Sequence, residues 1–315
     1  MKAKLGIYLP VYGGWVRNAP YEEGEVTYEY VEKVALKAEE IGIDSVWVPD
    51  HLLNPIKGEM ARSLEAWTTL TAIAAATEKV ELFHTCICQA FRYPAVLAKM
   101  CTTMSDVSKG RFSLAMGAGW FKREFDAYGI PWHEHDERVD RGREQIEIIR
   151  RFWTEPRFSY KGRFYEIVDG VMEPKPEKMP AVWWAGESER SRALIADLAD
   201  GWLMRNADIQ TVTQRIDDMK IRLQERGRKP IQYAMPSLVF ADETDEKALG
   251  KLSALVGGDV EILNSVRKSG FVGCPETIVE KVKRLDESGL DYIIFQTSPA
   301  FELLKIIGEQ ILPCL

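Results

Sequence analysis

His51 directly follows Asp50 at the end of an apolar run, "DSVWVPDH". A histidine in such a position can donate or accept a proton near neutral pH. A neutral, hydrogen-bonded core histidine is the structural alternative, and the residue types leave both open. His84 lies within another apolar run, "VELFHTCIC", which favours a structural role.

Glycines mark the end of a second apolar run, in "GRFSLAMGAGWFKREF" at 110–125. A dinucleotide-binding loop requires G-x-G-x-x-G in the first βαβ unit. Lys122 replaces the third glycine, and the run is the fourth predicted strand, so we do not assign this function. Glycines at a strand end also allow a flat ligand to approach the backbone. A tight turn without a ligand is the alternative.

The loop "AGES" at 185–188 precedes a predicted helix. Backbone amides of the first helical turn, together with Ser188 and Ser191, could hold a phosphate. Arg190 and Arg192 could add positive charge there. An ordinary N-cap by Ser188 is the structural alternative.

These residues belong to a chain in which strand-like and helix-like segments alternate. Apolar strands are expected at 5–10, 44–51, 80–88, 111–117, 181–186, 201–205, 231–241 and 291–297. Nearly all are followed by a segment with helical spacing of apolar residues, which predicts a (β/α)8 TIM barrel rather than an open sheet. Continuous apolar strands also fit a parallel sheet that is buried on both faces.

One segment breaks the alternation. Residues 154–180 alternate aromatic and polar side chains around Lys161-Gly162 and then become rich in proline and lysine. This pattern predicts an inserted β-hairpin and loop in a single domain spanning 1–315. The insertion could serve as part of a lid, or as packing and dimer surface.

The composition excludes several classes of protein. The chain has 315 residues, 46% hydrophobic, and a formal net charge of −7, which argues against a nucleic-acid partner. No apolar run is long enough for a membrane span or a signal peptide. Five scattered cysteines without a CxxC pair predict no disulfide framework and a cytoplasmic location. His133 and His135 lack partners in register, so we expect no metal site.

The active site of a TIM barrel lies at the C-terminal ends of its strands. The residues noted above stand at those ends, as do Trp15 after the first strand and Arg92 after the third. Arg205 ends the sixth. Arg92 and Arg205 could hold an anionic substrate, or each could make a structural ion pair. Trp15 and Trp120 could face a ligand.

Four longer stretches give the chain a family resemblance: "AFRYPAVLAKMCTTMSDVSKGRFSLAMGAGWFKREFDAYGIP", "HDERVDRGREQIEIIRRFW", "YEIVDGVMEPKPEKMPAVWWAGESERS" and "ADLADGW". The chain resembles the bacterial luciferase-like monooxygenases and their deazaflavin-dependent relatives. The resemblance implies a barrel with an insertion, often a homodimer. It also implies a flavin-type ring at the barrel mouth, with a non-proline cis bond or bulge behind it at Thr85 and Cys86.

The resemblance and the strand-end positions together give a set of candidate site residues. The candidate catalytic residues are His51 and Arg205, and the candidate substrate-contacting residues are Trp15 and Arg92. The candidate cofactor-binding residues are Asp50, Thr85, Cys86, Cys88, Gly117, Ala118, Gly119, Trp120, Gly186, Glu187 and Ser188.

The resemblance leaves two cofactors open. "VYGGWVRNAP" at 11–20 is similar to FMN-dependent pyrimidine and sulfone monooxygenases, in which a separate reductase supplies reduced FMN from NADH or NADPH. Asp50-His51 and "MGAGW" look more like enzymes that use the deazaflavin coenzyme F-420. Several FMN relatives carry polar Asn and Thr on the fourth strand, where this chain has Ala115 to Ala118.

We therefore expect, first, a two-component monooxygenase that uses reduced FMN and oxygen on a small organic substrate. A deazaflavin-dependent hydride-transfer oxidoreductase is the alternative. A non-catalytic flavin-binding barrel is the third hypothesis.

Overall fold

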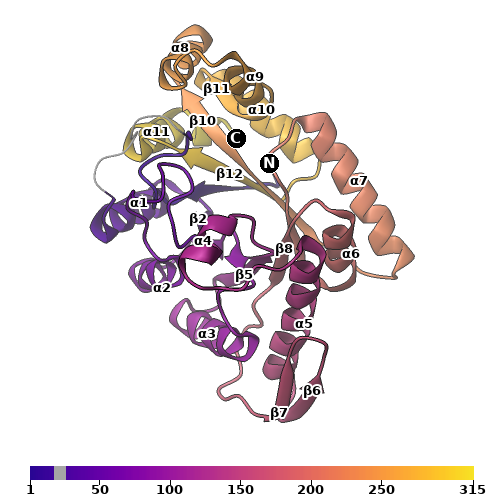
Figure 1. Ribbon diagram of the computed structural model, residues 1–315. Coiled ribbons are helices and arrows are strands. Elements are labelled where there is room, and N and C mark those ends of the chain that lie inside the picture. Colours follow the sequence, from indigo (N-terminus) through magenta and orange to yellow (C-terminus); the bar gives the residue numbers. More distant parts are fainter. Residues whose placement is uncertain (18–25) are drawn as a thin grey trace.

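The computed structural model describes residues 1–17 and 26–315, so the last three residues of the "VYGGWVRNAP" segment lie outside the described residues. Eight parallel strands form the barrel (Figure 1). They are β1 (Lys4–Tyr8), β2 (Ser45–Val48), β3 (Glu81–His84), β5 (Phe112–Gly117), β8 (Val182–Ala185), β9 (Gly201–Leu203), β10 (Gln232–Ala241) and β12 (Tyr292–Thr297). Each pairs with the next, and β12 pairs with β1. The predicted (β/α)8 TIM barrel is confirmed.

Two short strands lie beside this barrel. β4 (Ile87–Cys88) pairs with β5, and β11 (Phe271–Gly273) pairs with β10. The third predicted strand, 80–88, is thus two strands, β3 and β4, with a break at 85–86. β11 lies in a stretch for which the sequence predicted only helix.

Helices cover the outside of the barrel (Figure 1). The covering helices are α1 (Tyr28–Ile41), α2 (Ala66–Ala76), α3 (Pro94–Val107), α5 (His135–Thr154), α6 (Glu189–Leu198), α7 (Ile209–Glu225), α10 (Pro275–Glu287) and α11 (Ala300–Ile306), which continues into η1 (Ile307–Ile311) and η2 (Leu312–Cys314). Additional helices are α4 (Lys122–Ala127), α8 (Asp245–Leu255) and α9 (Val260–Ser269). No helix within the described ranges is both long and apolar enough to cross a membrane.

Aromatic side chains fill the barrel and fix the helices against it. Trp47 stacks on Phe83 with ring centroids 3.9 Å apart, and Trp183 meets both rings edge-on. Outside the barrel, the Trp184 indole packs so tightly against Gly142 of α5 that a Cβ at 142 would overlap it. A larger residue at 142 would therefore push α5 away from the sheet.

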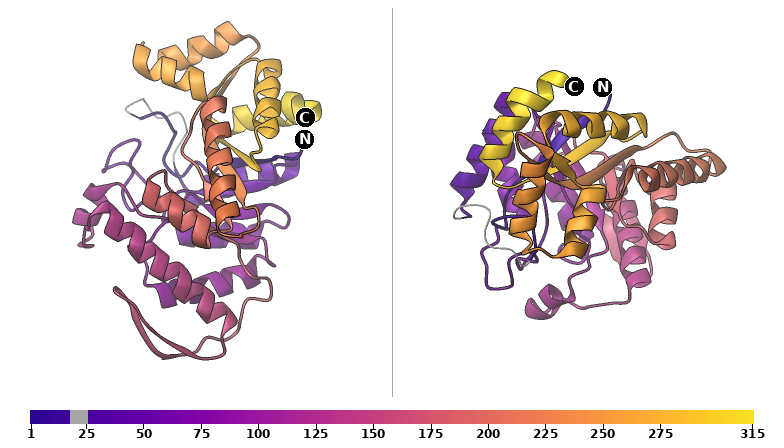
Figure 2. Two further views of the ribbon diagram at one scale, coloured as in Figure 1. Left: turned by 90° about the vertical axis from the view of Figure 1, so that its right-hand side faces the viewer. Right: turned by 90° about the horizontal axis from the view of Figure 1, so that it is seen from above.

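The inserted segment forms the predicted hairpin, with β6 (Phe158–Lys161) antiparallel to β7 (Glu166–Gly170). Figure 2 shows it beside α5 at the edge of the molecule. The ring of Phe158 lies 4.7 Å from that of Phe152 in α5. The Glu144 carboxylate of α5 accepts hydrogen bonds from three backbone N–H groups at 163–165. The hairpin is thus packed against α5.

Candidate active site

The peptide bond between Thr85 and Cys86 is cis. The family resemblance placed a cis bond or bulge at these two residues, and the position is confirmed. The chain then continues as β4 beside the end of β5, where Cys88 pairs with Gly117. The backbone N–H of Gln89 donates to the Gly117 carbonyl at 3.0 Å.

Two cysteine thiols occupy the space beside the glycines at the end of β5. A Cβ at Gly117 would lie 2.5 Å from Cys86 Sγ, and one at Gly119 would lie 2.7 Å from Cys88 Sγ. Gly119 also has a φ of +80°. These glycines are therefore required by the protein's own packing, which the sequence analysis did not foresee. Burial raises the pKa of the Cys86 thiol to about 12, so it is neutral at physiological pH.

His51 lies beside a carboxylate that the sequence analysis missed. Its Nδ1 is 3.0 and 3.1 Å from the two carboxylate oxygens of Glu124, which belongs to α4. The backbone N–H of Leu52 donates to the same carboxylate at 2.9 Å. The Glu124 side chain is 1% exposed and that of His51 is 14% exposed. The structure thus joins the end of β2 to the helix that follows β5.

Aromatic rings surround the imidazole of His51. Ring centroids of Tyr12, Trp120 and Phe121 lie 6.2, 5.4 and 6.2 Å from it. Trp15 stands behind Tyr12 at 5.7 Å and is almost fully buried. Trp120 is 55% exposed, so it still has surface with which to contact a ligand.

Asp50 and Arg92 form a buried ion pair. Two guanidinium nitrogens of Arg92 donate to the Asp50 carboxylate at 2.8 and 3.0 Å, and one of them also donates to Glu65. The backbone N–H of Cys88 donates to Asp50 as well. This is the structural alternative foreseen for Arg92, because its charge is matched by two carboxylates. Contacts of Asp50 with a cofactor and of Arg92 with a substrate stay predictions.

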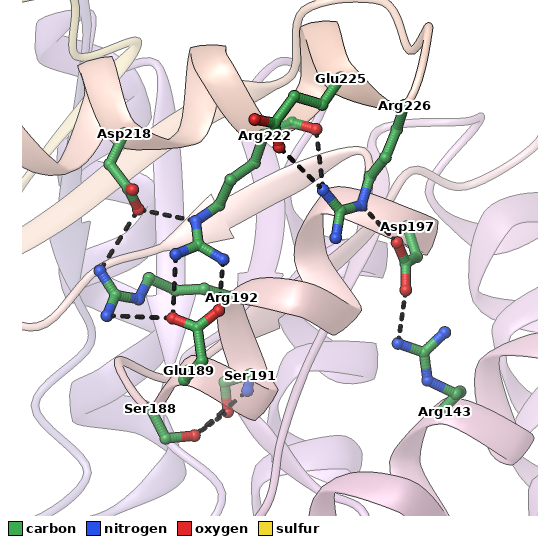
Figure 3. Close-up of polar contacts among 10 residues, drawn as sticks. All are labelled: Arg143, Ser188, Glu189, Ser191, Arg192, Asp197, Asp218, Arg222, Glu225 and Arg226. Carbon is green, nitrogen blue, oxygen red and sulfur yellow. Dashed lines mark hydrogen bonds and ion pairs between the residues drawn. The ribbon is translucent and has the colours of Figure 1, made fainter.

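The loop before α6 has a defined shape (Figure 3). The Ser188 hydroxyl caps α6 by accepting from the backbone N–H of Ser191 at 3.1 Å. Gly186 has a φ of +151°, and a Cβ there would lie 2.6 Å from the Ser191 hydroxyl. The Trp202 indole N–H donates to the Gly186 carbonyl. The N-cap by Ser188 is therefore present, and the phosphate-binding role of the loop stays a prediction.

Neither arginine of α6 is left without a carboxylate partner. Arg190 donates two hydrogen bonds to Asp140. Arg192 pairs with Asp218 and Glu189, in the network shown in Figure 3. The charge that the sequence analysis offered to a phosphate is thus already balanced by carboxylates.

Glu187 and Arg205 meet at the neighbouring strand ends. The backbone N–H of Arg205 donates to the Glu187 carboxylate at 2.7 Å, and Arg215 of α7 pairs with that carboxylate at 3.3 Å. Burial raises the pKa of Glu187. The Arg205 residue is exposed, and its catalytic role stays a prediction.

No group of three or more His, Cys, Asp or Glu side chains in the described ranges could hold a metal ion. His133 contacts Glu137, and His135 contacts Asp136. All five cysteines are free thiols.

Comparisons with known proteins agree with this architecture. Residues 13–269 match the family described as luciferase-like monooxygenase. The FMNH(2)-dependent dimethylsulfone monooxygenase of Pseudomonas putida is 25% identical over 350 residues, covering 98% of this chain and 94% of that protein. The F420-dependent glucose-6-phosphate dehydrogenase of Amycolatopsis mediterranei (strain U-32) is 40% identical over 308 residues, covering 89% of this chain and 92% of that protein.

A solved structure supports the fold. It is an F420-dependent secondary alcohol dehydrogenase in complex with an F420-acetone adduct, with a TM-score of 0.83 and 22% identity, covering 100% of this chain and 99% of that chain. The match to the family covers most of the sequence, including the strand-end loops described above. The chain therefore belongs to the luciferase-like monooxygenase family and is an oxidoreductase of that family.

Proposed function

We propose that this oxidoreductase transfers hydride between a deazaflavin of the coenzyme F-420 type and a small alcohol, or the carbonyl compound formed from that alcohol. The contact between His51 and the buried Glu124 carboxylate carries the proposal. When a hydride leaves an alcohol carbon, the hydroxyl proton must also be removed. An imidazole that is held in place by a carboxylate can accept that proton.

Two further observations favour the deazaflavin over FMN, which the sequence analysis ranked first. The relative named for the deazaflavin coenzyme is 40% identical, against 25% for the relative named for FMNH(2). The end of β5 also has no polar side chain at 115–118, where several FMN relatives carry Asn and Thr. Ala115 and Met116 are fully buried, and Gly117 and Ala118 follow them.

The strand ends fit a flavin-shaped cofactor. The indole N–H of Trp184 is buried without a hydrogen-bond partner, and this nitrogen would lie 3.5 Å from a Cβ at Gly186. A buried donor without a partner costs free energy, so a ligand acceptor at this loop would be favoured. The first-turn amides of α6 add positive potential for a phosphate. Gly186, Glu187 and Ser188 would hold the phosphate end, and the residues at 85–88 and 117–120 the ring.

The chemistry divides between cofactor and protein. A bound deazaflavin supplies the site that accepts or donates hydride. His51 accepts the hydroxyl proton of the alcohol at Nε2, and returns it to the carbonyl oxygen in the reverse direction. Tyr12, Trp120 and Phe121 surround the imidazole with apolar surface, which limits the access of water to the proton in transfer.

The second candidate is the two-component monooxygenase. It is supported by the FMNH(2)-dependent relative, which covers 98% of this chain. On this alternative, a separate reductase would supply reduced FMN from NADH or NADPH. A homodimer, the cytoplasmic location and the single-domain organisation remain part of the proposal for either candidate.

A binding titration tests the proposal. Purified protein is titrated with coenzyme F-420, reduced FMN and riboflavin, and cofactor and tryptophan fluorescence are followed. We expect the deazaflavin to bind at micromolar concentration and more tightly than reduced FMN. Tighter binding of reduced FMN would favour the monooxygenase, and binding of none of the three compounds would contradict both candidates.

A further inference from the structure

We propose that Glu124 is the positioning residue of the site: its carboxylate holds His51 with the proton on Nδ1, leaving Nε2 as the atom that exchanges a proton with the substrate. This inference rests on the proposed function for its catalytic meaning. The geometry on which it stands, however, is independent of any cofactor or substrate.

The hydrogen-bond pattern fixes the direction of the contact. Nδ1 of His51 lies 3.0 and 3.1 Å from the two carboxylate oxygens of Glu124, and carboxylate oxygens accept hydrogen bonds, so we assign Nδ1 as the donor. The backbone N–H of Leu52 donates to the same group at 2.9 Å. In the neutral imidazole, a proton on Nδ1 leaves Nε2 as an acceptor. Nε2 makes no hydrogen bond to a described residue.

The charged groups around Glu124 also bear on its interaction with His51. Its side chain is 1% exposed, and no lysine or arginine of the described ranges pairs with it. The neighbouring Asp50 carboxylate is matched by Arg92, and burial raises the pKa values of Tyr12 and Cys88, so that these groups stay neutral. A buried carboxylate without a cation is costly. Among the described residues, His51 is the side chain that pairs with Glu124 and can carry a positive charge there.

The proton balance follows from this arrangement. When hydride leaves the alcohol carbon for the cofactor, the hydroxyl proton passes to Nε2. His51 then carries a proton on each nitrogen and a positive charge beside Glu124. In the reverse reaction Nε2 releases its proton to the carbonyl oxygen, and the Nδ1-protonated neutral ring is restored.

The first test needs no ligand. The chain has four histidines, so the imidazole ¹⁵N spectrum of histidine-labelled protein is simple, and His51→Gln identifies the signals of His51. We expect a protonated Nδ1 and a bare Nε2 in neutral His51. In Glu124→Gln, whose amide can donate to Nδ1, we expect a shift toward the Nε2-protonated form. Unchanged signals in Glu124→Gln, or an Nε2-protonated ring in the parent, would overturn the proposal.

Asp126→Asn is the matched control, since Asp126 lies on the same short helix but is exposed and pairs only with Lys122. It should leave the His51 signals unchanged. Circular dichroism and urea unfolding check that Glu124→Gln is folded. A variant that fails to fold is replaced by Glu124→Asp, for which we expect the Nδ1-protonated form to be retained.

The second test measures turnover with the cofactor and substrate class of the proposed function. We expect Glu124→Gln to lower kcat/KM about 10- to 100-fold, part of the about 10²- to 10⁴-fold typical of general acid–base catalysis. The pH–rate profile of Glu124→Gln should differ from that of the parent, because the variant removes the carboxylate that contacts the imidazole of His51. An unchanged profile would contradict the role of Glu124. Absence of turnover in the parent, with the ¹⁵N result intact, would contradict only the proposed function.

Discussion

At the scale of single residues, the candidate site holds two carboxylates whose charges are handled differently. Asp50 is paired with Arg92, which also contacts Glu65, so one guanidinium pairs with two carboxylates in this cluster. Glu124 has His51 as its side-chain partner. A histidine can gain and lose its proton near neutral pH, whereas arginine cannot. We therefore propose that the chemistry belongs to the pair of His51 and Glu124, and that the pair of Asp50 and Arg92 supports the shape of the strand ends.

The buried His84 gives a prediction about stability. Burial, with a smaller effect of Arg92, lowers the pKa of His84 from 6.5 to about 3. Between these pH values the unfolded chain binds a proton at this residue that the folded chain does not, so unfolding becomes easier as the pH falls. We expect His84→Phe to lose part of the acid sensitivity of the parent, measured as the free energy of urea unfolding at pH 7 and pH 4.5.

The matched control is His135→Gln, because His135 is exposed on α5. It should keep the parent's difference between the two pH values. An acid sensitivity of His84→Phe equal to that of the parent would refute the assignment of this effect to His84.

At the scale of elements, the end of β5 is shaped by β4. Gly117 faces Cys86 Sγ so closely that no side chain fits between them. We expect Gly117→Ala to lower the free energy of unfolding by about 1–3 kcal/mol, since overpacking displaces the neighbouring strand. Cys86→Ala in the same protein should recover much of this loss by removing the sulfur, as measured by urea unfolding.

Gly250→Ala provides the comparison. Gly250 lies in α8 with open space around its Cα, and alanine there should stabilise the helix by about 0.5–1 kcal/mol. If Gly117→Ala did not lower the free energy of unfolding either, the close contact between Gly117 and Cys86 would be refuted.

The first turn of α6 gives a prediction about binding. Ser188→Ala removes the N-cap hydroxyl, which costs about 1 kcal/mol of stability. If the loop also holds a phosphate, the variant should bind the phosphate-bearing cofactor about tenfold more weakly, since a hydrogen bond to a charged group contributes about 1.5–3 kcal/mol. Binding of the dephosphorylated cofactor should be unchanged by calorimetric titration.

Thr244→Ala is the control, because Thr244 caps α8 in the same manner. It should lower stability without affecting either cofactor form. Equal weakening of both forms by Ser188→Ala would show that the hydroxyl acts only through the helix and not on the phosphate.

At the scale of the whole molecule, the periodic signals of the sequence predicted the architecture. Eight apolar strands with intervening helical spacing sufficed for the barrel, because each pattern is local. Other features depend on contacts between distant residues. The pairing of Glu124 with His51 joins positions 73 residues apart, and no local spacing could indicate it. The cis bond between Thr85 and Cys86 was expected only through the family resemblance, and neither the division of the third strand into β3 and β4 nor β11 was predicted.

In the candidate site, the role of Arg92 likewise depends on contacts between distant residues. The sequence placed it correctly after the third strand but could not decide between substrate contact and ion pair, since Asp50 and Glu65 come from other segments of the barrel. Similarly, the glycines of the fourth predicted strand indicated that another group approaches the backbone closely. The structure identifies the approaching atoms as the protein's own thiols.

The central claim is hydride transfer to a deazaflavin without oxygen. The most direct measurement is the absorbance of coenzyme F-420 under anaerobic conditions, with a panel of alcohols including a secondary alcohol and glucose 6-phosphate. We predict loss of deazaflavin absorbance with one of these alcohols, at a rate reduced about 10²- to 10⁴-fold in His51→Gln. No change with any alcohol, together with oxygen-dependent product formation from reduced FMN, would contradict the account.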